Sequence, residues 1–336
     1  MSARYRVAVL GADSLVGEAL LECLVEERFP AAEIRAYALQ PDIGAQISAG
    51  GEDWDLEDLQ GADLSGFDLL LAAPRCGLDA DRLAALAARA LVIDCDAAAA
   101  ANPALPLCAA GAAAGEGRSG LLAVPGALAL MLSAVLAPLR EAAGLARVDV
   151  TACLAVSDLG RDAVEELAQQ TRQLLTFQPV SGRQFDRQIA FNCLPRTGDL
   201  DVDGCSREER SAMEQLRRLL ALPELPLSVV ALRVPVFYGH GAWVGVELDR
   251  PLPLTAAQQL LAGTPGLRLV PPDTAPYYPT AVTEASGDSA IWVGRLRQDA
   301  SRPQAIQLWI VADNLRRGLA SNAVQLAAQR LAVGPG

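Results

Sequence analysis

The stretch Arg6-Val7-Ala8-Val9-Leu10-Gly11-Ala12-Asp13-Ser14-Leu15-Val16-Gly17 decides the fold of the N-terminal part of the chain. Its first five residues form a short, mostly apolar run that is typical of a buried strand, and the residues after Gly17 predict a helix from Glu18 to Val25. A glycine turn between such a strand and a helix is where the pyrophosphate of a dinucleotide binds, because the helix N-terminus presents free amides at the positive end of its dipole. The stretch therefore predicts a Rossmann-type dinucleotide-binding domain of the α/β class.

The turn supplies most of the candidate cofactor-binding residues, which are Gly11, Asp13, Ser14, Leu15, Val16 and Gly17. Ser14 lacks the conformational freedom that glycine gives where a backbone approaches phosphate. Asp13 can cap the helix, which would use the amides that a phosphate needs, and its charge would repel the phosphate. Two interpretations stay open: an intact nucleotide site, or a Rossmann-type turn that no longer needs a ligand.

A second stretch, Arg233-Val234-Pro235-Val236-Phe237-Tyr238-Gly239-His240, holds the only histidine of the chain. Alternating apolar positions on both sides of Gly239-His240 predict two strands, with the glycine at a bend between them. Histidine ionises near neutral pH and is the usual general base, so His240 is a candidate catalytic residue. The alternative is a histidine that only caps the end of a strand.

Several segments of the chain together resemble the aspartate-semialdehyde dehydrogenase family, and most closely its Usg-type paralogues that lack the catalytic cysteine. They are Gly11-Ala12 to Gly17, Leu91-Val92-Ile93-Asp94, Ala155-Val156-Ser157, Phe191-Asn192, Arg233-Val234-Pro235-Val236 with Gly239-His240, and Val311 to Gly318. These segments follow one another from the first strand to the last helix, so the resemblance covers essentially the whole chain. It implies a Rossmann-type domain formed by residues 1–127 and 313–336, and an α+β dimerisation domain with a mixed or antiparallel sheet formed by residues 128–312. It also implies a homodimer.

The resemblance implies a chemistry in which a cysteine thiolate attacks the aldehyde, NADP takes the hydride and phosphate releases the acyl group. In the family the nucleophile follows an Asn-Pro-Asn sequence just before a helix, whose N-terminus stabilises a thiolate. Here the corresponding run is Val124-Pro125-Gly126-Ala127, so the nucleophile position is Ala127. An alanine methyl can neither attack a carbonyl nor carry an acyl group.

Other positions depart from the family pattern in the same direction. The family sequence Tyr-Gln-x-x-Ser-Gly, whose glutamine orients the reacting carbonyl, corresponds to Cys153-Leu154-Ala155-Val156-Ser157-Asp158. Ala100 and Ser211 replace an arginine and a lysine that contact phosphate. Cys153 is considered as a substitute nucleophile, but its position on a strand favours a cysteine packed in the core.

The cofactor preference is also expected to change. Pro41, Asp42 and Ala45 replace residues with which the family grips the 2′-phosphate of NADP. Asp42 lies about 20–30 residues beyond the glycine turn, where an acidic residue can bind a ribose diol. No cofactor is expected to be required; if one binds, NAD is favoured over NADP. A plain surface aspartate explains Asp42 equally well.

Arg233 and His240 are retained, and in the family they bind the substrate carboxylate and act as acid and base. Asn314, in the retained segment near the C-terminus, is assigned to the cofactor site. A pocket for a small carboxylate ligand is therefore one interpretation. In the other, Arg233 pairs with a neighbouring acid and His240 caps a turn.

Composition excludes several classes of function. The formal charge of −12 and the pI near 4.7 argue against binding to nucleic acid or to an anionic membrane. The N-terminus lacks the apolar segment of a signal peptide, and no run is long and apolar enough for a transmembrane helix. The seven cysteines have no metal-binding or disulfide spacing, so we expect a cytoplasmic protein with reduced thiols and no metal.

Three functions are compatible with the sequence. The first is a catalytically impaired paralogue that keeps the dimer scaffold as a non-catalytic binding or partner protein. The second is an NAD(P)-dependent oxidoreductase that acts on a small carboxylate without the usual cysteine thioester. The third is a subunit that pairs with an active homologue.

Overall fold

The computed structural model describes residues 4–111, 118–271 and 275–332. The chain divides into two compact units, Met1–Gly126 with Leu319–Gly336, and Ala127–Gly318. The second boundary lies at Gly318 and not at residue 313, because Asp313 and Asn314 bond within the second unit. Asp313 accepts a hydrogen bond from the Gly287 amide (2.8 Å), and Asn314 accepts one from the Gly239 amide (2.9 Å).

In the described part of the first unit, seven strands form one sheet in the order β3-β4-β2-β1-β5-β6-β7. The strands are β1 (Tyr5–Leu10), β2 (Ala31–Ala38), β3 (Gln46–Ala49), β4 (Glu52–Asp58), β5 (Leu69–Ala72), β6 (Leu91–Asp94) and β7 (Gly120–Ala123). All neighbours are parallel except β3 and β4, which form the antiparallel hairpin at one edge. Every residue of β5 and β6 is buried, as is usual for a parallel sheet that helices cover on both faces.

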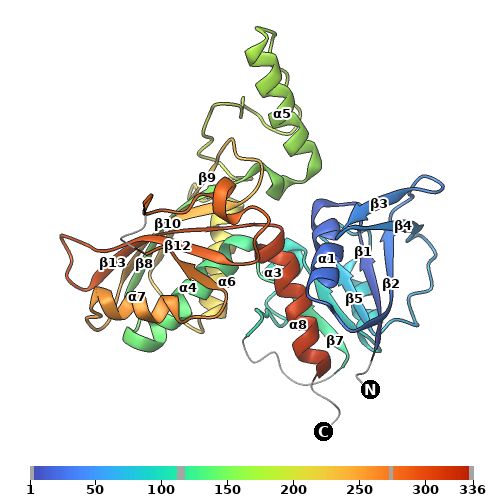
Figure 1. The fold of residues 1–336 in the computed structure, drawn as a ribbon, viewed down its shortest axis with the longest axis horizontal. Coiled ribbons are helices and arrows are strands. Elements are labelled where there is room, and N and C mark those ends of the chain that lie inside the picture. Colours follow the sequence, from blue (N-terminus) through green and yellow to red (C-terminus); the bar gives the residue numbers. More distant parts are fainter. Residues whose placement is uncertain (1–3, 112–117, 272–274, 333–336) are drawn as a thin grey trace. The chain divides into compact units, whose positions relative to one another are not determined.

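The helices of this unit are α1 (Leu15–Glu26), α2 (Ala80–Ala87), α3 (Ala97–Ala101) and α8 (Ser321–Ala332). In Figure 1 the C-terminal helix α8, in red, lies beside α1, in blue. The Ser321 hydroxyl donates a hydrogen bond to Glu27 just after α1 (2.8 Å), so residues almost 300 positions apart share one unit. The predicted Rossmann-type arrangement is confirmed.

The second unit contains a six-stranded mixed sheet, among its described residues, in the order β11-β12-β13-β10-β8-β9. Its strands are β8 (Arg147–Leu154), β9 (Leu227–Arg233), β10 (His240–Glu247), β11 (Leu267–Leu269), β12 (Ile291–Gln298) and β13 (Ala305–Ala312). Its helices are α4 (Ala127–Ala143), α5 (Arg161–Leu175), α6 (Arg207–Leu219) and α7 (Leu254–Ala262), with short helical segments at Val156–Leu159 (η1), Ala281–Ala285 (η2) and Arg316–Ala320 (η3). Pairing is antiparallel in the middle of the sheet and parallel at β8–β9 and β11–β12, which confirms the predicted mixed sheet.

The two faces of this sheet differ because side chains alternate along each strand. In β8, Val148, Val150, Ala152 and Leu154 are buried in a core that α4, α6 and α7 share. The intervening residues of β8, from Asp149 to Cys153, point to the opposite face, which we call the open face.

Some local expectations need correction. The strand expected just before Gly239 ends earlier, at Arg233, because Pro235 has no amide to donate to a ladder. The last helical stretch begins with η3 and continues without a break into α8. Helix α6 begins with a capping box formed by Ser206 and Glu209.

Candidate functional site

The glycine turn after β1 is closed by Ser14. The Ser14 hydroxyl accepts a hydrogen bond from the Gly17 amide (3.0 Å) and donates one to the Gly11 carbonyl (2.7 Å). Ser14 is therefore the N-cap of α1, and the expectation that Asp13 caps this helix is wrong. Ser14 has the extended backbone of an N-cap residue (φ −85°), so it needs no glycine. Gly17 is required, because a Cβ at this position would overlap the Gly11 carbonyl.

This turn keeps part of an anion site. Among the described hydrogen bonds, none uses the amides of Leu15 or Val16, which lie at the positive end of the α1 dipole. The Gly17 amide is occupied by Ser14, and Asp13 is exposed beside the turn. Two amides thus remain where a pyrophosphate could bind, with a carboxylate close to them in sequence.

Asp42 lies in an exposed turn beyond the end of β2. Its carbonyl accepts a hydrogen bond from the Ala45 amide (2.9 Å), and Gly44, with φ +76°, completes the turn. The end of β2 itself is followed by Gln40, whose amide donates to Asp58 (3.2 Å). The structure thus holds Asp42 on a surface turn and does not show it at the strand end, where acids that bind a ribose usually lie.

Ala127 is the first residue of α4 and is buried, with 8% of its surface exposed. Its methyl group packs against Gly318 at the end of the second unit, and a Cβ at position 318 would lie 2.5 Å from the Ala127 Cβ. Residue 127 thus lies at the N-terminus of a helix, where the helix dipole would stabilise a thiolate. Alanine offers no group for that field to act on.

Arg233 and His240 converge on one carboxylate, that of Asp158. The Arg233 guanidinium donates from Nη1 to Asp158 Oδ2 (3.1 Å) and to the Ala155 carbonyl (2.8 Å). The His240 Nε2 faces the other carboxylate oxygen, Oδ1, at 3.6 Å. Arg233 and His240 are 2% and 1% exposed, so neither can exchange this partner for water without movement. Of the two interpretations of Arg233, the geometry matches pairing with an acid of the same chain.

The hydrogen bonds of His240 define its tautomer. The Ala155 amide donates to Nδ1 (3.1 Å), so the ring proton lies on Nε2, which points at Asp158. Burial alone would raise the pKa of Asp158, but its interaction with His240 and the charge of Arg233 outweigh burial and hold that pKa well below its usual range. The three side chains thus form a closed group in which Asp158 stays ionised.

Asn314 supports this group from its position just after β13. Its Oδ1 accepts hydrogen bonds from the Gly239 amide (2.9 Å) and from the Ser157 hydroxyl (3.1 Å), and both lie next to members of the group. The side chain is 2% exposed. The oxygen of the residue assigned to a cofactor is therefore used to hold the loops that carry His240 and Asp158.

Two acidic residues near Arg233 were not predicted from the sequence to belong to the site. Asp158 occupies the position where the family sequence Tyr-Gln-x-x-Ser-Gly has glycine, and this added charge is the signal that could have identified it. Glu208, on α6, has a pKa that is raised by burial although Arg233 lowers it. Its Oε2 is buried and has no hydrogen-bond partner among the described residues.

Cys153 lies on the open face of the sheet, so the expectation of a core cysteine is wrong. It lines a cavity of about 460 Å³ together with Gly241, Trp243, Arg295 and Trp309. Trp243 and Trp309 are paired across β10 and β13, and the Arg295 guanidinium lies 5.4 Å from the Trp243 ring centre. Burial raises the pKa of the Cys153 thiol. Position 153 belongs to the outward-pointing residues of β8, which the apolar composition of the strand did not reveal.

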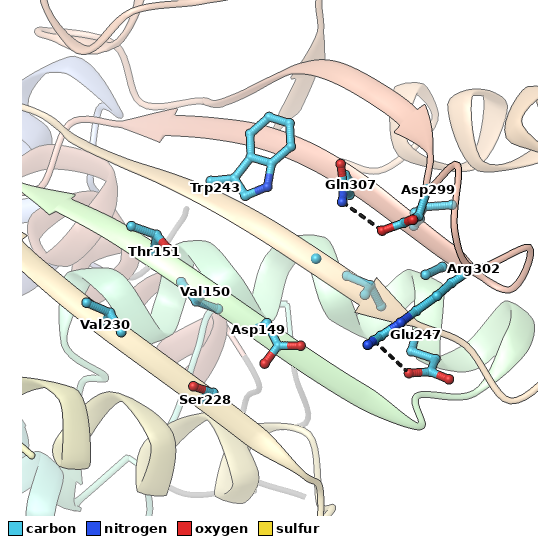
Figure 2. Close-up of a pocket in the computed structure, with 14 residues that line it drawn as sticks. Asp149, Val150, Thr151, Ser228, Val230, Trp243, Glu247, Asp299, Arg302 and Gln307 are labelled. Atoms are coloured by element: carbon cyan, nitrogen blue, oxygen red, sulfur yellow. Dashed lines mark hydrogen bonds and ion pairs between the residues drawn. The ribbon is translucent and has the colours of Figure 1, made fainter.

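The open face continues along the strands in Figure 2. Thr151 on β8 lies opposite Trp243 on β10, Asp149 lies further along β8 opposite Gly245, and Val230 and Ser228 lie on the edge strand β9. Polar pairs close the other end, where Arg302 contacts Glu247 (3.4 Å) and Gln307 donates to Asp299 (2.8 Å). This face combines large aromatic side chains with paired charges.

Comparison with known proteins gives consistent matches over the whole length. Residues 136–317 match the family model described as semialdehyde dehydrogenase, dimerisation domain. The chain is 34% identical over 332 residues to an aspartate-semialdehyde dehydrogenase of Legionella pneumophila, covering 97% of this chain and 96% of the relative. It is 37% identical over 330 residues to a USG-1 protein homolog of Pseudomonas aeruginosa, covering 97% of each.

Solved structures agree with these sequence matches. Aspartate semialdehyde dehydrogenase II of Vibrio cholerae, in complex with ASA, superposes with a TM-score of 0.92 at 30% identity, over 99% of each chain. A more distant structure, that of the Candida albicans enzyme with NADP, shares the fold at 17% identity and a TM-score of 0.69 over 98% of this chain and 99% of that one. In the described part of this chain, no helix combines the length and the apolar character needed to cross a bilayer.

Proposed function

This chain belongs to the aspartate-semialdehyde dehydrogenase family, and from that premise we propose that it is a non-catalytic member, which keeps the two-unit scaffold as a binding or partner protein. The observation that carries the proposal is Ala127 at the first position of α4. The family reaction forms a covalent bond to a thiolate at that position, and an alanine methyl cannot form this bond.

The other groups of the site support the proposal. Arg233 is paired with Asp158, and both ring nitrogens of His240 face groups of the chain itself. Leu154 is buried in the apolar core at the position of the carbonyl-orienting glutamine. Cys153 is a poor substitute nucleophile, because burial raises its pKa and it lies on a strand of the open face.

The second candidate is an oxidoreductase that uses His240 as a base on a small carboxylate. It requires Arg233 free for the substrate and a His240 nitrogen free for a proton. Both are occupied by Asp158 and by the backbone of Ala155, so the geometry favours the non-catalytic proposal.

We also propose which cofactor the protein could bind and in which compartment it is found. The protein requires no dinucleotide, and any residual binding favours NAD, since no cationic residue lies in the 40–45 segment to hold a 2′-phosphate. Binding would use the amides of Leu15 and Val16, in a turn whose shape depends on Gly11 and Gly17, because a Cβ on either would lie close to other residues of the chain. The cysteines are seven in number, scattered along the chain and unpaired, which supports a cytoplasmic protein with reduced thiols.

The partner proposed first is a second copy of the chain. The dimerisation domain of the family covers residues 136–317, and the half-buried Trp243 and Trp309 line the open face beside the segment that carries Pro279 and Ala281. Partly accessible tryptophans on a sheet face are typical of association sites. The acidic surface gives no support for nucleic acid as a partner.

The test is an assay of phosphate-dependent oxidation of aspartate semialdehyde with NADP and, separately, with NAD. We expect the wild-type rate to equal the enzyme-free blank, while the Legionella relative serves as positive control under the same conditions. Ala127→Cys is the matched variant, and it supplies the thiol without changing Ala100, Ser211 or Leu154. Turnover by the wild-type protein well above the blank would refute the proposal.

A further inference from the structure

Arg233, His240 and Asp158 come from three different elements and meet only in the folded chain. Arg233 ends β9, His240 begins β10, and Asp158 lies in η1 after β8. The side chains of Arg233 and His240 are almost fully buried, whereas the Asp158 side chain is 31% exposed. The carboxylate therefore reaches the group from its solvent side.

The donors are arranged as a receptor for one carboxylate. Arg233 Nη1 addresses Oδ2 at 3.1 Å, while the protonated Nε2 of His240 faces Oδ1 at 3.6 Å. The guanidinium donates to one oxygen and the imidazole N–H faces the other at a longer distance, so together they favour one position and orientation of a carboxylate. We propose that Arg233 and His240 form a carboxylate-binding site whose occupant is Asp158 of the same chain, so that the intact protein excludes small free carboxylates from it.

The tether of Asp158 explains why an external carboxylate cannot compete. The preceding residues are held by hydrogen bonds from the Val156 amide to the Val236 carbonyl (2.9 Å) and from the Ser157 amide to the Phe237 carbonyl (3.1 Å). A tethered group acts at an effective concentration of about millimolar or higher without further loss of freedom. A free formate or acetate would also have to leave Asp158 unpaired beside its own charge.

Glu208 is the other acid that faces this group. Among the described ion pairs it has none with Arg233, but its carboxyl is close enough to feel both Arg233 and Asp158 electrostatically. When Asp158 is removed, Glu208 is the one internal group that we expect to compete for Arg233. The double variant Asp158→Ala/Glu208→Gln removes this competitor.

A carboxylate site filled by Asp158 presupposes the proposed function in one respect, that Arg233 and His240 serve no catalytic substrate. The experiment that tests this site measures melting temperature and not enzymatic turnover. A negative result would therefore leave the semialdehyde assay, which tests the proposal based on Ala127, unaffected. Asp158→Ala vacates the space of a carboxylate and leaves Arg233 and His240 without an anion. Small carboxylates should then bind and restore stability.

The experiment measures the melting temperature of the full-length chain in sodium formate and in sodium chloride of equal ionic strength, with formamide as the neutral analogue of the same shape. For Asp158→Ala, and at least as strongly for the double variant, we expect a formate-specific rise of about 3 °C. The wild type should show none. Asp158→Asn should also show none, because the asparagine still fills the space.

Asp199→Ala is the matched control, since Asp199 is 98% exposed and pairs with Arg196 at 3.2 Å on the surface. It should respond equally to formate and chloride. If Asp158→Ala does not fold in chloride, the refolding yield in formate against chloride gives the same comparison. Equal behaviour of formate and chloride for both Asp158→Ala and the double variant would overturn the proposal, as would a formate-specific rise in the wild type.

Discussion

Replacing Asp94 by asparagine should stabilise the protein at neutral pH but not at acidic pH. Asp94 ends β6 and is 7% exposed, and burial raises its pKa from 3.8 to about 6, although a hydrogen bond from the Asp96 amide (2.9 Å) lowers it. Between these two values the folded chain holds a proton that the unfolded chain has released. Stability therefore falls as pH rises from about 4 to about 6, and the full cost remains above pH 6.

The size of the effect follows from the shift. A difference of about 2 pKa units, at about 1.4 kcal/mol per unit, gives a cost of at most about 3 kcal/mol at pH 7.5. An asparagine side chain would keep an oxygen for the Asp96 amide and cannot ionise, so Asp94→Asn should recover up to that amount at pH 7.5 and close to none at pH 4.

Urea unfolding of both proteins at pH 4.0, 5.0, 6.0 and 7.5 measures this difference. Asp13→Asn, which changes an exposed aspartate in the same unit, is the control and should show no comparable pH-dependent gain. A gain from Asp94→Asn that is equal at all four pH values, or a loss at pH 7.5, would refute the reasoning.

Three further predictions concern the cap, the histidine and the open face. Ser14→Ala should lower the free energy of unfolding in urea by about 1 kcal/mol, because the Ser14 hydroxyl accepts a hydrogen bond from the Gly17 amide. Asp13→Ala should change it by almost nothing, and a larger loss from Asp13→Ala than from Ser14→Ala would contradict this assignment. Nitrogen-15 NMR of the single histidine should find its proton on Nε2 at pH 7.5, since Nδ1 accepts from the Ala155 amide, and a proton on Nδ1 would exclude this geometry. Thr151→Arg, which places a charge beside Trp243 on the open face, should convert a dimer into a folded monomer in size-exclusion chromatography with light scattering, and an unchanged dimer would exclude this face as the interface.

Much of the fold follows from short-range patterns in the sequence. The apolar run before Gly11 predicts β1, and the capping box at Ser206 predicts the start of α6, because both depend on neighbouring residues. The resemblance to the family supplied the longer-range part, including the mixed sheet of the second unit. The boundary at residue 313 was misplaced because hydrogen bonds from Gly287 and Gly239 hold Asp313 and Asn314 in the second unit, and these partners are distant in sequence.

Features of the candidate site that depend on a single sequence position could be predicted. Features that depend on contacts between distant residues could not. Ala127 could be placed at a helix start by counting along the chain. The pairing of Arg233 with Asp158 joins residues 75 positions apart, and the sequence left open which acid, if any, Arg233 contacts. The outward direction of Cys153 likewise depends on which face of β8 is covered by helices.

The most direct test of the central claim is the intact mass of the protein after incubation with an acyl phosphate of aspartate. The family chemistry, run in the direction of reduction, forms a thioester on the nucleophilic cysteine. With Ala127 in that place and seven cysteines elsewhere in the chain, we predict an unmodified mass, whereas the Legionella relative should gain the acyl group. A hydroxylamine-labile acyl adduct on any cysteine of this protein would contradict the account.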